Sequence, residues 1–128
     1  MRLLLDTNVF LTILGERINT LKRLMQEALV SSEAAVHVSV ASFWEIAIKV
    51  RLGKLALGMP LALLPELTQR LGVELIAINH HHVLTAVEPE PATRDPFDRL
   101  LLAQCLTENL RLMTIDRALL AHPLAWRA

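Results

Sequence analysis

The pattern of apolar and polar positions predicts short strands that alternate with helices along the chain. Apolar runs typical of buried strands occupy residues 3–5, 36–40, 73–78 and 112–115. Segments with helical spacing or helix-start signals lie between them, at residues 7–14, about 17–30, 42–52, 65–71 and from Asp95 onward, with short helices after Asn79 and Asp116. A brief strand near Trp126 closes the pattern.

This alternation implies a three-layer α/β/α domain with a central, mainly parallel sheet. The chain has 128 residues, the size of one ordinary domain, so we expect residues 1–128 to form a single domain. Hydrophobic residues make up 53% of the sequence and aromatic residues only 4%. This aliphatic bias suits a buried parallel sheet and argues against a stacking platform for single-stranded nucleic acid.

The helix expected at 42–52 carries two features that bear on function. Ser42 and Glu45 have the spacing of a capping box, which predicts a helix that begins at Ser42. The same helix is apolar on two sides, with Phe43 on one and Trp44 on the other. A helix of this kind is buried or lies at an interface, so we expect a contact there with a second copy of the chain, as in a homodimer, or with another protein.

Charge and cysteine content narrow the class of protein. Thirteen basic residues balance thirteen acidic ones, so the overall charge does not indicate a nucleic-acid ligand. A local basic patch could still hold RNA phosphates. A subset of the following basic residues could form such a patch: Lys49, Arg51, Lys54, Arg94 and Arg99. The single Cys105 is expected in the core, and it suits a reducing cytoplasm. No signal peptide or membrane span is expected.

The four aspartates of the chain stand where strand-like runs meet helices. Asp6 and Asp116 end two apolar runs, and Asp95 and Asp98 frame the start of a leucine-rich helix. Ligands of open parallel sheets bind beyond the carboxyl ends of the strands. Carboxylates gathered there repel one another, so a divalent cation is the obvious way to hold them together.

Each of these acids also has a plain structural interpretation as a helix cap. Asp6 and Asp116 could cap the helices that follow them, and Asp95 is oriented as the cap of its own helix, which leaves Asp98 as the better ligand. The joint pattern favours a site, because caps scattered by chance would not collect at one edge of a sheet.

An all-carboxylate cluster suits Mg²⁺ or Mn²⁺, whereas zinc prefers His and Cys. Thr114 and Asn8 stand beside the acids and could support them. The run from His80 to His82 is not expected to bind one ion, because consecutive helix residues point in different directions.

Four sequence blocks resemble the PIN-domain nucleases, in particular the VapC-type toxins of bacterial toxin–antitoxin pairs. In order along the chain they are Asp6-Thr-Asn8, Ser42-Phe-Trp-Glu45-Ile-Ala-Ile-Lys49 with Gly53-Lys-Leu55, Arg94-Asp-Pro-Phe-Asp-Arg99-Leu-Leu, and Thr114-Ile-Asp116. The resemblance spans nearly the whole chain.

The resemblance implies a PIN-like fold with four or five parallel strands and an endoribonuclease that hydrolyses RNA with water activated by Mg²⁺ or Mn²⁺. It also implies the role of a type II toxin, inhibited by a small VapB-like antitoxin. The family's catalytic set falls on Asp6, Glu45, Asp98 and Asp116, with Thr114 as the supporting hydroxyl. Asp6, Asp98 and Asp116 are the expected metal ligands, and Glu45 completes the site or orients a water.

Two positions depart from close relatives of this family. Asn8 and Thr93 stand where those relatives often carry His. The acidic residues are unaffected, but the branch of the family, and with it the substrate, is not defined by these positions. The residues alone leave two alternatives open. One is a phosphotransferase or phosphatase that uses Asp6 as nucleophile, and the other is a receiver-like or binding module whose acids are only caps.

Overall fold

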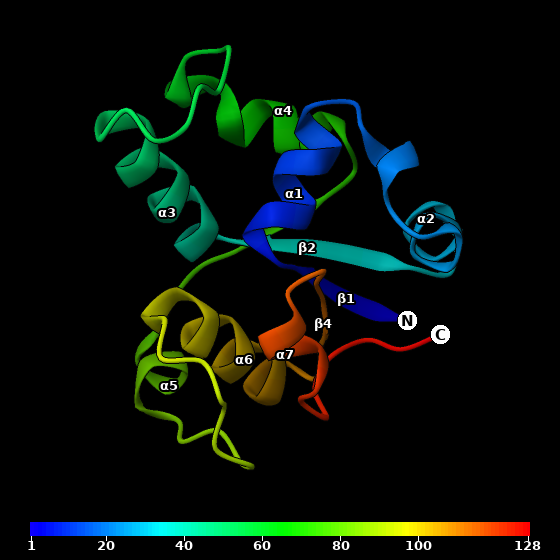
Figure 1. Ribbon diagram of the computed structural model, residues 1–128, viewed down its shortest axis with the longest axis vertical. Helices are drawn as coiled ribbons and strands as arrows, with labels where there is room; N and C mark the ends of the chain where they lie inside the picture. The colour runs from blue at the N-terminus through cyan, green and yellow to red at the C-terminus, as the bar shows by residue number, and fades with distance from the viewer.

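The computed structural model describes residues 1–128 and contains a four-stranded sheet between two layers of helices (Figure 1). The strands are β1 (Arg2–Leu5), β2 (Ala35–Ser39), β3 (Glu74–Ile76) and β4 (Arg111–Met113). Their order is β3-β2-β1-β4, and all neighbouring pairs are parallel. The expected α/β fold with a parallel central sheet is therefore confirmed.

The α-helices are α1 (Thr7–Leu14), α2 (Arg23–Val30), α3 (Val40–Arg51), α4 (Leu64–Arg70), α5 (His80–Leu84), α6 (Pro96–Glu108) and α7 (Arg117–Leu120). Two 3-10 turns, η1 (Ile18–Thr20) and η2 (Leu61–Leu63), precede α2 and α4. Helices α1, α2 and α4 lie on one side of the sheet and α5, α6 and α7 on the other, while α3 follows β2 and reaches α6 (Figure 1).

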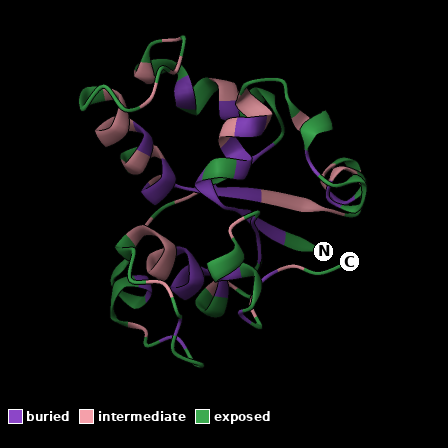
Figure 2. Ribbon diagram, in the orientation of Figure 1, coloured by how far each residue is buried: buried purple, intermediate pink, exposed green.

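Alternation along β1 explains why the sheet is buried on both faces. Leu3 and Leu5 belong to one hydrophobic cluster, with Phe10 and Ile46, whereas Leu4 belongs to a second cluster beneath α6. All three leucines are 0% exposed, and the buried residues of Figure 2 concentrate along the strands and the inner sides of the helices. A strand packed on both faces reads as a continuous apolar run, which is what residues 3–5 show.

The topology changes direction between β1 and β4. The chain moves outward from β1 to β2 and β3, and then returns to the other side of β1 to form β4. Such a switch point is where open α/β sheets bind ligands. Asp6 follows β1 directly, and its backbone N–H donates to the carbonyl of Met113 at the end of β4 (2.9 Å). The two strand ends that carry Asp6 and Asp116 are thus held side by side.

The prediction that α3 begins at Ser42 is wrong. The helix begins at Val40, directly after β2, and Ser39 is its cap, with Oγ accepting from the amide of Ala41 (3.0 Å). Ser39 keeps the extended backbone of the strand, so its hydroxyl lies in position to cap the first turn. Ser42 is a buried residue inside the helix, and Glu45 lies in the second turn and not in a capping box.

The prediction of one helix over about residues 17–30 is also wrong, because this segment forms two separate elements, η1 and α2. Leu21 and Lys22 have extended backbone angles that separate η1 from α2, and the side-chain amide of Gln26 donates to the Leu21 carbonyl (2.7 Å) across the break. The break lets Leu21 reach the core, where it is 6% exposed, whereas Leu24, three positions later, is 56% exposed.

Other local predictions are confirmed. Asn79, Asp95 and Asp116 cap α5, α6 and α7 through their side chains. The expected terminal strand is a single parallel bridge between Leu112 and Ala125. Cys105 is buried in the core, where burial raises its pKa to about 12. None of the helices combines the length and apolar character needed to cross a membrane.

Candidate active site

Asp6 directly follows β1, and the residue is only 4% exposed. It occupies the cap position of α1 but makes no side-chain cap bond. Its Oδ2 instead accepts a hydrogen bond from the hydroxyl of Thr114 (2.7 Å). Burial raises the pKa of Asp6, the Thr114 bond opposes this rise, and the charges of Glu45 and Asp116 add to it.

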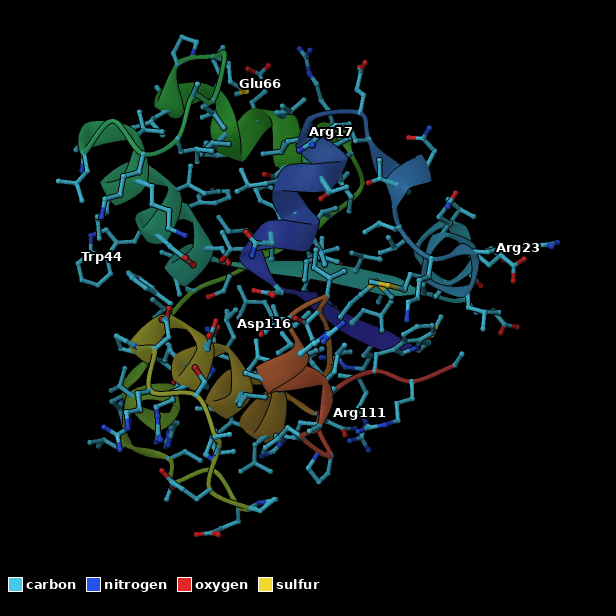
Figure 3. All side chains as sticks on the ribbon, in the orientation of Figure 1. Arg17, Arg23, Trp44, Glu66, Arg111 and Asp116 are labelled. Atoms are coloured by element: carbon cyan, nitrogen blue, oxygen red, sulfur yellow. The ribbon has the colours of Figure 1, made fainter.

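Thr114 joins Asp6 to Asp116. Its Oγ1 also accepts from the backbone N–H of Asp116 (3.0 Å), so one hydroxyl touches both acidic segments. Asp116 Oδ1 accepts from the amide of Ala118 (2.9 Å) as the cap of α7. Asp116 lies at the centre of the molecule between the two helical layers (Figure 3). It therefore serves as a cap and faces the site as well.

Asp98 occupies the first turn of α6, which Asp95 caps by accepting from the amides of Phe97 (2.8 Å) and Asp98 (3.4 Å). Thr93 completes this start: its hydroxyl accepts from the Asp95 amide (3.2 Å) and donates to Asp98 Oδ2 (3.1 Å). Burial, followed by the charges of Asp95, Asp6 and Asp116, raises the pKa of Asp98 to about 6. Thr93 therefore positions the carboxylate of Asp98.

Glu45 projects from α3 and is held at both oxygens. Thr7 Oγ1 lies 2.8 Å from Glu45 Oε1 and 2.8 Å from Ser42 Oγ. Thr7 has one hydroxyl proton, so when it donates to the carboxylate, Ser42 donates to Thr7. Glu45 Oε2 accepts from the ammonium of Lys49 (2.8 Å), and this bond raises the pKa of Lys49. Glu45 is thus held by two direct donors, Thr7 and Lys49, and Ser42 in turn holds Thr7.

The fold brings Asp6, Glu45, Asp98 and Asp116 into one electrostatic cluster, because the pKa of Asp6 responds to Glu45 and Asp116 and that of Asp98 to Asp6 and Asp116. No three His, Cys, Asp or Glu side chains stand close enough, with these side-chain positions, to surround one ion. Protein donors hold one oxygen of each aspartate and both oxygens of Glu45.

The donor set nevertheless fits a hard divalent cation. Asp6, Asp98 and Asp116 offer only oxygen, and Lys49, which bonds Glu45, is the only basic side chain hydrogen-bonded to any of the four acids. Carboxylates that raise one another's pKa are stabilised together by a cation with oxygen preference. The residues present therefore suit Mg²⁺ or Mn²⁺ better than zinc.

The other candidates have different surroundings. His82 is buried, with Nε2 2.9 Å from Glu108 Oε1 and Nδ1 accepting from the Asn79 amide, whereas His80 and His81 are exposed. Asn8 is exposed and takes no part in the hydrogen bonds of the four acids. Of the basic residues considered for phosphate binding, Lys49 pairs with Glu45 and Arg99 with Glu90.

Sequence reasoning missed Thr7 and Ser42 as supports of Glu45. Both are buried hydroxyl residues; Thr7 directly follows Asp6, and Ser42 precedes Glu45 by three positions. Buried polar side chains are rarely without a partner, so a Thr directly after Asp6, between the apolar run that ends at Leu5 and the one that starts at Val9, was the available signal.

Comparisons with known proteins agree with this geometry. The family model for the PIN domain matches residues 3–123, so the chain belongs to the PIN-domain family. PIN domains are nucleases. The fold is also similar to a chain in the crystal structure of VapBC2 from Rickettsia felis bound to a DNA fragment from their promoter. The TM-score is 0.67 at 17% sequence identity, over 98% of this chain and 96% of that chain. No curated protein matches the sequence.

Proposed function

We propose that this protein is a divalent-metal-dependent endoribonuclease and the toxin of a type II toxin–antitoxin pair, with residues 1–128 acting as one PIN domain. The observation that carries the proposal is a buried carboxylate, Asp6, at the switch point of the sheet, in the field of Glu45, Asp98 and Asp116. Family membership favours this nuclease over a receiver-like module or an aspartate-based phosphotransferase. A cellular RNA substrate and a free Cys105 both suit the cytoplasm.

The residues have distinct roles in this proposal. Asp6, Asp98 and Asp116 would hold Mg²⁺ or Mn²⁺, which when bound supplies a Lewis acid that activates water and offsets charge at the phosphodiester. Glu45, fixed by Thr7 and Lys49, orients the water and accepts its proton. Thr114 holds Oδ2 of Asp6, and its hydrogen bond favours the ionised form by opposing the rise in the pKa of this carboxyl group.

The antitoxin is proposed by analogy with the similar structure, which is a complex of VapBC2. A surface that suits such a protein partner, or a second copy of the chain, is the outer side of α3. Trp44 is 59% exposed there and packs edge-on against Phe97, with ring centroids 5.6 Å apart. Phe97 is half-buried beneath it, and an exposed Trp on such a support is typical of interface cores. We propose that Trp44 and Phe97 lie in the interface of a homodimer.

The dimer is tested by the mass of the protein in solution. Trp44→Glu should convert dimers to monomers, whereas Val30→Glu, at a side chain 74% exposed on α2, should not. A wild-type monomer at micromolar concentration would reject the homodimer. It would leave the nuclease proposal intact.

The nuclease is tested by cleavage of labelled RNA with Mg²⁺ or Mn²⁺. Asp6→Asn should abolish cleavage, because Asn keeps an acceptor for Thr114 but loses the charge. Asp95→Asn is the matched control, because it removes the charge of an aspartate close to Asp98 while Asn remains a good cap for α6. Full activity in folded Asp6→Asn would overturn the proposal.

The toxin role needs a separate test. Induced expression in a bacterial host should arrest growth, and the Asp6→Asn protein should not. Co-expression of a small antitoxin-like protein from an adjacent reading frame should restore growth. Cleavage in vitro without growth arrest would keep the nuclease but reject the toxin.

A further inference from the structure

A groove leads away from the acid cluster on the side of α2 and α7. It has a volume of about 720 Å³, the largest of the four main cavities, and is formed by the start of α2, the connection from β4 to α7 and residues 126–128. We call it the α2–α7 groove. Its volume lies in the range of roughly 300–1,000 Å³ that small-ligand sites occupy.

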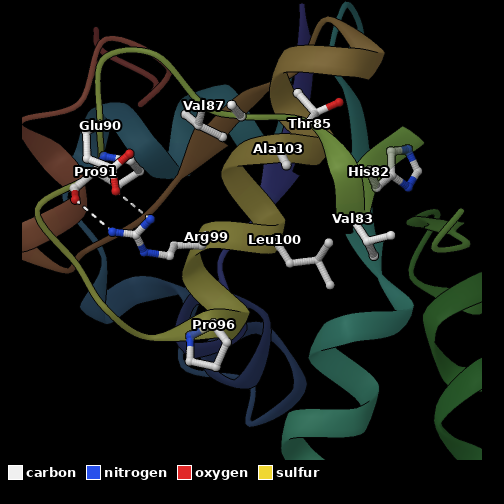
Figure 4. Close-up of a pocket in the computed structure, with 11 residues that line it drawn as sticks. His82, Val83, Thr85, Val87, Glu90, Pro91, Pro96, Arg99, Leu100 and Ala103 are labelled. Atoms are coloured by element: carbon white, nitrogen blue, oxygen red, sulfur yellow. Dashed lines mark hydrogen bonds and ion pairs between the residues drawn. The ribbon is translucent and has the colours of Figure 1, made fainter. Parts of the chain in front are cut away.

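The α2–α7 groove begins at the site. Thr114, which bonds Asp6, is one of its lining residues, and Ile115 continues the wall toward α7. The other main cavities contain no residue hydrogen-bonded to any of the four acids. The cavity between α5 and α6, for example, contains Arg99, whose guanidinium already contacts Glu90 and the Pro91 carbonyl (Figure 4).

The charged side chains that line the groove are all basic. Its lining includes four basic residues and no Asp or Glu: Lys22, Arg23, Arg117 and Arg127. Arg23 is paired with Glu27 (3.1 Å), but the other three have no carboxylate within ion-pair distance. Arg127 donates to the carbonyls of Leu120 (2.7 Å) and His122 (3.4 Å), which orient its guanidinium without cancelling its charge.

The floor of the groove is apolar. Ile115 is 49% exposed and Leu120 is 36% exposed, and Trp126 lies beside them. Trp126 is held in place, because its backbone N–H donates to the Leu112 carbonyl (2.8 Å) and its side chain packs on the core. The sequence gives no multi-aromatic platform, but one fixed indole suffices to stack a single base.

We propose that the α2–α7 groove binds the single-stranded RNA that continues from the scissile phosphate, with Lys22 and Arg117 on its phosphates and a base on Trp126. This rests on the proposed nuclease function. Four carboxylates at the site repel RNA, and the chain has a net charge of +0, so binding needs a local excess of cations next to the acids. The basic residues of the α2–α7 groove supply this local excess of positive charge.

The test measures binding of a fluorescein-labelled, mixed-sequence RNA octamer to the inactive Asp6→Asn protein, so that cleavage does not interfere. Lys22→Gln with Arg117→Gln should weaken Kd about tenfold and reduce the slope of log Kd against log salt by about 1.4, at about 0.7 per phosphate contact. The matched control is Arg17→Gln with Arg70→Gln, which removes the same charge away from Asp116, as Arg17 in Figure 3 shows. The control should change Kd less than twofold.

Trp126 gives an independent signal. The chain has two tryptophans, so Trp44→Phe leaves Trp126 as the only one. In Trp44→Phe/Asp6→Asn protein, saturating RNA octamer should quench tryptophan fluorescence, and in the Lys22/Arg117 variant the quenching should need about tenfold more RNA. Unchanged fluorescence at saturation would overturn the stacking contact.

The possible outcomes distinguish a failure of the groove proposal from a failure of the nuclease proposal on which it rests. If Asp6→Asn still cleaves RNA, the nuclease proposal fails whatever the groove does. If wild type cleaves, Asp6→Asn does not, and the Lys22/Arg117 variant binds RNA like its control, only the groove proposal fails. If that variant loses affinity for a hexaglutamate peptide and keeps its affinity for RNA, the groove is a docking site for an acidic protein segment and the RNA assignment is overturned.

Discussion

Thr114 donates a 2.7 Å hydrogen bond to Oδ2 of Asp6, and this bond links the ends of β1 and β4 at the switch point of the sheet. The same hydroxyl accepts from the Asp116 amide. One side chain therefore sets the position of two of the acids proposed to bind metal. It also explains how a carboxylate only 4% exposed is kept in place without a basic partner.

Removal of this hydroxyl tests its role. Thr114→Val keeps the shape of the side chain, leaves Asp6 and the Asp116 amide without their partner, and should cost about 1–3 kcal/mol of folding free energy. It should also lower RNA cleavage at least tenfold and move the pH profile of cleavage upward, because loss of the bond lets the pKa of Asp6 rise further. Urea denaturation and kcat/KM against pH measure these effects. Thr114→Ser should restore both, and equal losses in the Ser and Val variants would contradict the role of the hydroxyl.

Thr7 should matter through Glu45. Thr7→Val removes the donor to Glu45 Oε1 and the partner of Ser42, at a residue that is only 2% exposed. We therefore expect the variant to lose about 1–3 kcal/mol of folding free energy and to cleave RNA more slowly. Thr12→Val is the control, since its hydroxyl bonds only the Asn8 carbonyl within α1. A Thr7→Val protein as active as Thr12→Val would show that Glu45 needs no such support.

The pKa of Asp98, raised to about 6 from 3.8, predicts a pH-dependent stability. A raised folded-state pKa contributes stability that is present below the unfolded value, near pH 4, and is lost as pH rises through about 6. In EDTA, Asp98→Asn should therefore gain stability relative to wild type as pH goes from 4 to 7, by about 1 kcal/mol after allowance for solvent screening of this partly exposed group. Urea melts at both pH values measure the difference. A difference that shrinks with rising pH would contradict the shift.

The cap of α6 can be separated from the chemistry. Asp95→Ala removes the acceptor for the amides of Phe97 and Asp98 and should cost about 1 kcal/mol, whereas Asp95→Asn should cost only a few tenths. Thermal unfolding compares the two. If Asp95→Asn abolished cleavage in a folded protein, Asp95 would belong to the site and not to the helix start alone.

The sequence predicted the parts of this fold that depend on local chemistry. Asp95-Pro96 fixed the start of α6, and Asn79 the start of α5, because a cap depends on the adjacent backbone. The start of α3 was misplaced since Ser39 and Ser42 are equally good caps locally, and only the end of β2 decides between them. The break at Leu21 likewise depends on the core that this residue enters.

The site was predictable as a set of acids but not as a network. Parallel strands bring Asp6 and Asp116 to one edge by topology alone. The bonds that hold the carboxylates, from Thr7, Thr93 and Thr114, depend on side-chain positions that no periodicity encodes. The unpaired cations of the α2–α7 groove come from segments almost a hundred residues apart, so no local run of basic residues reveals them.

The central claim is that these acids form a cation site and are not merely helix caps, and thermal unfolding with increasing Mn²⁺ tests it most directly. An ion that binds the folded state raises stability by mass action, by roughly 2.7 kcal/mol at a hundred times its Kd. We predict that Mn²⁺ raises the Tm of wild-type and Asp95→Asn protein but not of Asp6→Asn or Asp98→Asn. A Tm that does not respond to Mn²⁺ in the wild type, or rises equally in all four proteins, would contradict the claim.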